Sequence, residues 1–319
     1  MRKRISQKQS VQDQYLEALL TGGVALLHLE EIEEALSTIQ QACDLAQLAG
    51  DQPRRSIALS CLALCNIAQN RPVQAISLGK EALSTALRSA AVRAEILAQR
   101  ALSEAYLRSE NPAEATFHIE QGLSTALNMR LLAPQSQFWN LTAKTLFEVN
   151  ELDAAAIAGA KALKIADDLQ IRPAQIESRL TLARISLEAG DSEAALKHSS
   201  IAVHLGVSLG IDFYQWRGKA IFAQSALLTG QKSEAKKAFI EAIAELDRLR
   251  MRRRENSREK TETLLEEWNA RELWQNWLMF LFKTEGAEAA RKQAAAADWP
   301  PLMDWLETQI SEKGGTPNA

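Results

Sequence analysis

Residues 176–210 read IESRLTLARISLEAGDSEAALKHSSIAVHLGVSLG, and the fold of the chain depends on this stretch. Leu, Ile and Val recur at spacings of three and four residues on both sides of Gly190-Asp191, which is typical of amphipathic helices. Glycine between the two patterns permits the left-handed conformation that ends a helix. The stretch therefore predicts two helices that fold back on each other.

The same pattern returns at steps of forty residues between Tyr15 and Leu249, and small residues mark it in three columns. The second helix of each pair carries Ala35, Ala75, Ala115, Ala155, Ala195 and Ala235. The first helix carries Gly23, Ala63, Ser103, Ala143, Ala183 and Ala223. Seven residues beyond the alanines of the second helix stand Ala42, Ala82, Gly122, Ala162, Ala202 and Ala242. Small side chains let neighbouring helices approach closely, so the sequence predicts a stack of six helix pairs.

This layout resembles the tetratricopeptide repeat over residues 15–249. Trp139 and Tyr106 stand where that family often places tryptophan and tyrosine. The usual unit has about 34 residues, and units of forty are similar to the variant in MalT-type activators and Rap-type peptide sensors of bacteria. HEAT and armadillo repeats share the length but lack the alanine columns, and they rank second. The resemblance implies an all-α, right-handed superhelical solenoid of six helix pairs with a C-terminal helical cap.

Helix ends and domain limits follow from the same period. We expect the first helices to end near residues 30, 70, 110, 150, 190 and 230, with Asn111 taking the left-handed position one residue late in the third unit. Pro72 and Pro112 should open the returning helices. The expected domains are a basic N-terminal segment at 1–14, six repeats at 15–250, a Trp-rich cap at 251–311 and a disordered tail at 312–319.

The C-terminal part departs from the period. A basic run from Arg248 to Lys260 is interrupted by Glu255 and Glu259, and it can pair with an acidic stretch at 262–267, so nucleic acid is not favoured as a partner. Tryptophans follow this run, and we interpret them as a cap over the last repeat, with an oligomer or partner interface as the alternative. The interface candidates are Trp268, Trp274, Trp277 and Trp305.

Composition narrows the function classes. The net charge is −3 and the pI about 6.0, so the chain as a whole has no bias toward nucleic acid or membranes. We find no signal peptide, and the most apolar stretch, Leu273–Phe282, is shorter than the roughly 20 residues of a membrane-spanning helix. Three cysteines are too few for a disulfide framework, which predicts a reducing, cytoplasmic location.

The search for chemistry yields no catalytic set. The four histidines are scattered, and the sequence has none of the phosphate-loop, zinc-protease or nucleophile-elbow motifs. Cys61 and Cys65 share a helix face, with Cys43 expected nearby, and we interpret all three as buried small apolar residues rather than metal ligands. We therefore predict no enzyme, no cofactor and no metal.

The resemblance implies that the first helix of each unit faces a concave groove. In the middle and last units these positions are polar, and six of them are the predicted partner-binding residues: Arg100, Asn140, Lys144, Arg184, Arg217 and Gln224. Arginine binds carboxylates through a planar fork and asparagine can pair with a peptide backbone, so an acidic peptide is a suitable ligand. The competing interpretation is a solvated wall on which Arg100 pairs with Glu104, and Arg184 with Glu188 or Glu177.

These observations favour a non-catalytic scaffold or regulatory sensor module that holds a protein or peptide in its groove. A chaperone C-terminus is not the expected client, because the positions of the first units that would bind it are apolar. The alternative function is a self-assembling structural component that associates through the Trp-rich C-terminal helices.

Overall fold

A computed structural model describes the backbone of residues 2–29, 31–256, 268–297 and 299–312. Within these residues the chain is helical and has no strand, so the predicted all-α helical solenoid is confirmed. The repeat helices are α1 (Arg2–His28), α2 (Ile32–Ala49), α3 (Gln52–Ala68), α4 (Pro72–Arg88), α5 (Val92–Arg108), α6 (Pro112–Asn128), α7 (Leu132–Glu148), α8 (Leu152–Asp168), α9 (Arg172–Glu188), α10 (Ser192–Leu209), α11 (Asp212–Leu228) and α12 (Lys232–Asn256). The last helices are α14 (Trp268–Glu285), α15 (Ala287–Ala296) and α16 (Pro300–Glu312).

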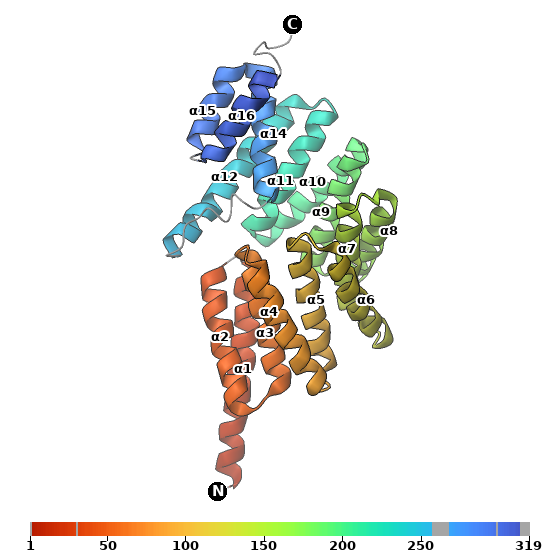
Figure 1. Ribbon diagram of the computed structural model, residues 1–319, viewed down its shortest axis with the longest axis vertical. Coiled ribbons are helices and arrows are strands. Elements are labelled where there is room, and N and C mark those ends of the chain that lie inside the picture. The colour runs from red at the N-terminus through yellow and green to blue at the C-terminus, as the bar shows by residue number, and fades with distance from the viewer. Residues whose placement is uncertain (1, 30, 257–267, 298, 313–319) are drawn as a thin grey trace.

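The helix pairs stack in chain order into a curved array, with α1 at one end and α14–α16 at the other (Figure 1). Consecutive helices pack on each other throughout α1–α12. All residues of the three small-residue columns are buried, and the six alanines of the second-helix column have no exposed surface. Gly122 lies so close to the ring of Phe138 that an added Cβ would overlap that ring. Close approach of the helices is therefore the reason for the columns.

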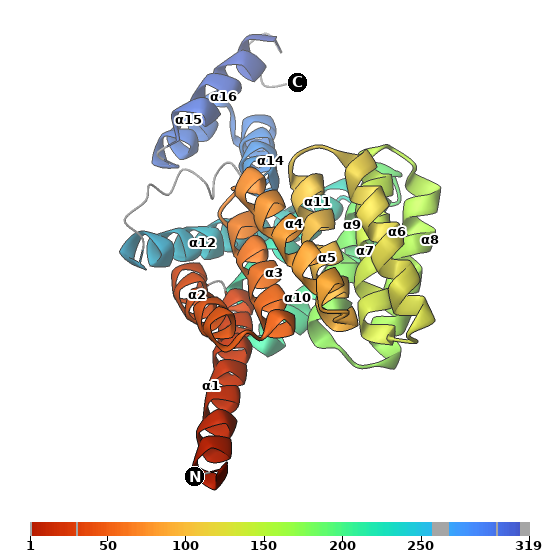
Figure 2. The ribbon, with the colours of Figure 1, turned by 60° about the horizontal axis from the view of Figure 1, so that its bottom comes forward.

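The N-terminal basic segment at 1–14 has helical backbone from Arg2 onward and is continuous with the rest of α1. Both overall views show this half of α1 projecting beyond its partner helix α2 (Figures 1 and 2). At the other end, Glu312 is the last residue of α16, and the rest of the predicted tail, 313–319, lies outside the described residues.

Turns between helices use left-handed residues at steps of twenty from 50 to 230. Glycine occupies four of these positions, and six are occupied by other residues: Asn70, Ala90, Glu110, Arg130, Asn150 and Gln170. The sequence prediction that Asn111 is the left-handed residue of the third unit is wrong, because Glu110 takes that conformation. Asn111 instead caps α6, with its Oδ1 accepting a hydrogen bond from the Glu114 N–H at 3.3 Å. Pro72 and Pro112 open α4 and α6, as the sequence predicts.

Ala90 offers a test of these turns. Its φ of 52° is unfavourable for a residue with a Cβ, so Ala90→Gly should stabilise the fold by about 0.5–1 kcal/mol after the extra unfolded-state entropy of glycine is subtracted. Urea denaturation should show a higher midpoint. The matched control is Gly210→Ala, which adds a Cβ at φ 66° in open space and should lower the midpoint. A lower midpoint for the Ala90 variant would contradict the left-handed backbone conformation at this position.

The last repeat and the C-terminal helices share one apolar core. Trp216 and Phe239 from α11 and α12 pack with Trp274 and Trp277 from α14, and leucines of α16 close the cluster. Trp277 stacks on Phe280 with ring centroids 5.7 Å apart. These helices therefore cover the apolar end of the repeat stack.

This core corrects the interface prediction for two of the four tryptophans. Trp274 and Trp277 are 3% and 4% exposed, so they are not available to a second molecule. Trp305 is partly buried against the same core. The side chain of Trp268 lies outside the described part of the chain. Two of the four predicted interface tryptophans are therefore core residues of the cap.

Candidate functional site

The concave side of the solenoid contains a cavity of about 420 Å³ that is open to solvent and is called the chamber below. Its walls come from the first helices of all six units. The early units contribute the C-terminal halves of α1, α3 and α5, α7 contributes residues along its middle from Ser136 to Lys144, and the last two units contribute the N-terminal halves of α9 and α11. Curvature of the stack thus places Leu27 of the first unit and Arg217 of the sixth in the wall of one cavity.

Four of the six residues predicted for the groove line this chamber: Arg100, Asn140, Lys144 and Arg217. They come from three helices, α5, α7 and α11. Asn140 is only 8% exposed, and its buried Oδ1 has no hydrogen-bond partner within the described residues. This oxygen is an acceptor, so a partner inside the chamber would have to donate an N–H or O–H to it.

Glu177 is the charged centre of the chamber, and the sequence analysis did not select it. Its carboxylate accepts hydrogen bonds from Lys144 Nζ at 3.3 Å and from Arg217 Nη1 at 3.0 Å. Burial raises the pKa of this carboxyl group, but Lys144 and Arg217 outweigh burial and hold the pKa at about 2. One carboxylate therefore joins α7, α9 and α11 across the concave wall.

Carboxylates of the protein already pair with three of the predicted basic groove residues, Arg100, Lys144 and Arg217. Arg100 Nε donates to Glu104 Oε1 at 2.8 Å, which matches the solvated-wall alternative. Lys144 and Arg217 share Glu177. Spacing within one helix revealed the first pair. The second arrangement joins three different units, so no pattern along the sequence could show it.

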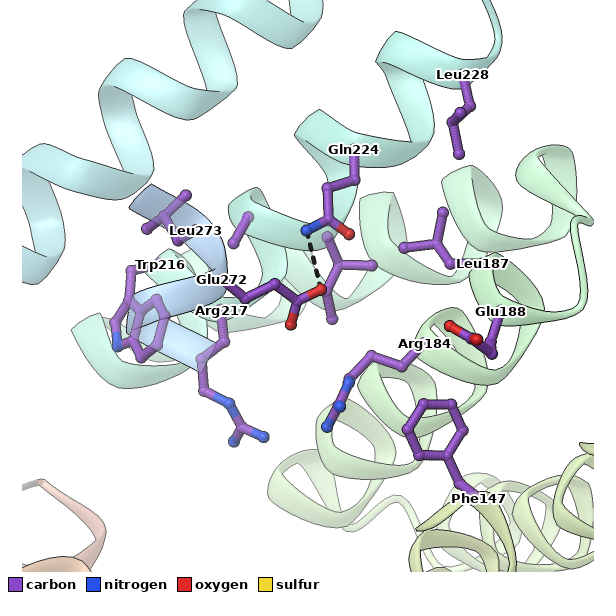
Figure 3. Close-up of a pocket in the computed structure, with 12 residues that line it drawn as sticks. Phe147, Arg184, Leu187, Glu188, Trp216, Arg217, Gln224, Leu228, Glu272 and Leu273 are labelled. Atoms are coloured by element: carbon purple, nitrogen blue, oxygen red, sulfur yellow. Dashed lines mark hydrogen bonds between the residues drawn. The ribbon is translucent and has the colours of Figure 1, made fainter. Parts of the chain in front are cut away.

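Arg184 and Gln224 lie in a second cavity of about 220 Å³ between α9, α11 and α14, and Arg217 lines both cavities. Gln224 Nε2 donates to Glu272 Oε1 of α14 at 3.2 Å (Figure 3). The Arg184 guanidinium stacks over the ring of Phe147, 4.9 Å from its centroid. Burial lowers the pKa of Arg184; Glu272 partly offsets this effect, and Arg217 adds to it. The six predicted residues therefore do not form one continuous groove.

Figure 3 shows the guanidinium groups of Arg184 and Arg217 turned toward the same space, with Glu188 on the far side of the Phe147 ring. The competing interpretation paired Arg184 with Glu188 or Glu177, and the hydrogen-bond donors to Glu177 in the structure are Lys144 and Arg217. The cap contributes Glu272 and Leu273 to this cavity, so α14 forms part of its wall.

The cysteines are all buried, and burial raises the pKa of Cys61 to about 11 and also raises that of Cys43. Across the described residues, no three His, Cys, Asp or Glu side chains are grouped as metal ligands. A search of the same residues finds no helix of the length and apolarity needed to cross a membrane. In the basic run, Arg248 and Arg250 pair with Glu245 and Asp247, and the acidic stretch at 262–267 lies outside the described residues.

Comparison with known proteins supports the fold and goes no further. No family model matches the sequence, and no curated protein matches it. A Rap protein in complex with competence and sporulation factor is similar to this chain with a TM-score of 0.68 and 11% identity, over 93% of this chain and 76% of that one. The apo form of RapI has a TM-score of 0.58 and 13% identity, over 87% of this chain and 99% of that one.

A signal-transduction ATPase with a tetratricopeptide-repeat sensor, from Pyrococcus horikoshii, is also similar, with a TM-score of 0.63 and 16% identity. The match covers 89% of this chain but only 42% of that protein, so the chain spans less than half of its length. The fold is therefore that of a tetratricopeptide-type, Rap-like repeat solenoid.

Proposed function

We propose that this chain is a non-catalytic binding module, a cytoplasmic scaffold or regulatory sensor, that receives a segment of a protein or a peptide in the chamber. The observation that carries the proposal is the chamber itself, which the first helices of all six units line and which holds Arg100, Asn140, Lys144 and Arg217. Solenoids of this kind commonly bind on their concave side. The similar structures include a Rap protein bound to competence and sporulation factor, which is in keeping with such a role.

Charge favours an acidic ligand, as the sequence analysis expects. Lys144 is the most suitable contact, because 37% of its side chain is exposed while its ammonium group is held beside Glu177. A carboxylate of the ligand would bind this ammonium group through a charge-assisted hydrogen bond. The alternative function, self-assembly through tryptophan, cannot use Trp274 and Trp277, because both side chains are buried in the core of the cap.

Photo-crosslinking tests the proposal. A photoreactive phenylalanine analogue at Gln137, an exposed residue of the chamber wall, should crosslink to a partner in a lysate of the source organism. Lys144→Glu should remove the crosslink, because it places a second carboxylate beside Glu177. Circular dichroism should show unchanged helix content.

The matched control replaces Lys197, an exposed residue of α10 that does not line the chamber, with Glu and, separately, with the photoreactive residue. Lys197→Glu should leave the crosslink from Gln137 intact. The photoreactive residue at position 197 should not capture the same partner. Equal capture from both positions would contradict binding in the chamber.

A further inference from the structure

The two ends of the chamber differ in polarity. The C-terminal ends of α1 and α3 present Leu27, Leu64, Ile67 and Ala68, together with one polar residue, His28. The basic side chains come from α5, α7 and α11. A ligand that satisfies both walls needs an apolar body and a charged head.

The charges of the chamber determine the sign of that head. Four basic side chains, those of Arg100, Arg108, Lys144 and Arg217, line it together with two carboxylates, so two positive charges are in excess. One excess charge belongs to Lys144 and Arg217, which share one carboxylate.

The other excess charge belongs to Arg108, which the sequence analysis overlooked. It lies one turn beyond Glu104 on the same face of α5, and Arg100 already pairs with that carboxylate at 2.8 Å. Arg108 forms no ion pair with any described residue and is half-buried. A half-buried cation without a counterion gains a charge-assisted contact from a bound anion, so the charge of the chamber favours an acidic ligand.

Asn140 gives independent support for a ligand at this place. Its amide is more than nine-tenths buried, lines the chamber and leaves Oδ1 without a hydrogen-bond partner among the described residues. Buried polar atoms are rarely left unsatisfied in proteins. An amide oxygen accepts a hydrogen bond, so its partner would be a donor such as a backbone N–H of a peptide ligand and not the carboxylate head. Asn140 also precedes Lys144 by one helical turn on α7, so both act on the same part of the chamber.

The size of the chamber restricts the ligand. About 420 Å³ lies within the range of roughly 300–1,000 Å³ that is usual for small-molecule pockets. A space of this size accommodates a chain end of a few residues or a short acyl chain.

We infer that the chamber binds an amphiphilic carboxylate, with the acidic head at Arg108 or at the Lys144–Arg217 pair and the apolar body against Leu64 and Ile67. The inference rests on the proposed use of the chamber as a binding site and adds the chemical class of the ligand. The C-terminal end of a peptide and an alkanoate share this chemistry, and the test separates these two sources.

Isothermal titration calorimetry on the full chain should use two matched pairs of probes. The first pair is octanoate and octanamide; the second is N-acetyl-Leu-Leu-Ala with a free carboxylate and the same peptide as its C-terminal amide. The acid of at least one pair should bind about tenfold more tightly than its amide, since only the acid makes a charge-assisted contact. Added salt should reduce this preference. The probe pair that shows the preference for the acid identifies the ligand as an alkanoate or as the C-terminal end of a peptide.

Variants locate the contact. Either Arg108→Met or Lys144→Met should remove most of the preference for the acid, according to which of the two cations holds the head, while the affinity for the amide stays the same. Ile67→Asn should weaken both members of a pair. An unchanged preference for the acid in both cation variants would contradict the inference. Lys197→Met on the exposed face of α10 is the control and should change neither affinity. Circular dichroism should establish that each variant is folded.

Equal binding of acids and amides, or no binding of any probe up to about 10 mM, would overturn the inference. In that case the crosslink from Gln137 decides what remains. If the crosslink persists and still depends on Lys144, the proposed function stands and only the ligand class is wrong. If no partner crosslinks to position 137 either, the chamber is not the binding site.

Discussion

Glu177→Gln should lower the free energy of unfolding by about 2–3 kcal/mol at pH 7, and the melting temperature by several degrees. The substitution keeps the size of the side chain but removes the charge that lies between Lys144 and Arg217, so two cations are left beside each other in a partly buried wall. Breaking such a pair commonly costs about 3–5 kcal/mol when it is fully buried. The Glu177 side chain is 24% exposed, so we expect a smaller value.

The stabilising effect of Glu177 should depend on pH. Because the pKa of Glu177 is about 2 in the folded chain and near 4.5 when unperturbed, its stabilising effect is fully present above pH 4.5. The effect is lost as the pH falls from there toward 2. The difference in stability between wild type and Glu177→Gln should therefore narrow between pH 5 and pH 3. Urea denaturation at several pH values measures it.

Glu188→Gln is the matched control, because Glu188 lies on the same helix α9, is exposed and forms no ion pair with any described residue. It should leave stability within about 0.5 kcal/mol of wild type at every pH. A Glu177 variant as stable as this control would mean that the carboxylate does not join the three helices.

Trp277→Ala should destabilise the C-terminal end of the stack by about 3–5 kcal/mol. The indole is 4% exposed, stacks on Phe280 and lies 5.8 Å from the Phe239 ring of α12, so truncation leaves a large cavity between cap and last repeat. Units of a solenoid contact only their neighbours, and the loss should therefore be local. Calorimetry should show an early transition separate from that of the first repeats.

Trp305→Ala is the companion variant, because Trp305 is only partly buried against the same core, and its effect should be smaller. Sedimentation of both variants also tests the self-assembly hypothesis. If Trp277→Ala kept the stability of wild type and changed only the oligomeric state, Trp277 would be an interface residue and its place in the core would be wrong.

Some residues of the candidate site could be predicted from the sequence, and others could not. Arg100, Asn140, Lys144 and Arg217 were predictable, because each falls at a repeat position that faces inward and each belongs to a residue type that binds acidic or peptide groups. Arg108 does not fall at one of the repeat positions that face inward in this family. Its position at the end of α5 matters only because the early helices contribute their C-terminal ends to the chamber.

By itself, the sequence determined the repeating unit. Each alanine column, each turn and each opening proline acts within one helix pair or between adjacent pairs, over distances that a local pattern encodes. This explains why the buried columns and the starts of α4 and α6 agree with the prediction.

Only the tertiary structure decided how the units close around a chamber and which charges meet in it. A small rotation between neighbouring units accumulates along the stack until Leu27 and Arg217 line one cavity, although 189 positions separate them in the chain. The same rotation selects Glu177 as the shared partner of Lys144 and Arg217. No local pattern specifies that accumulated angle, because it is the sum of packing between many side chains.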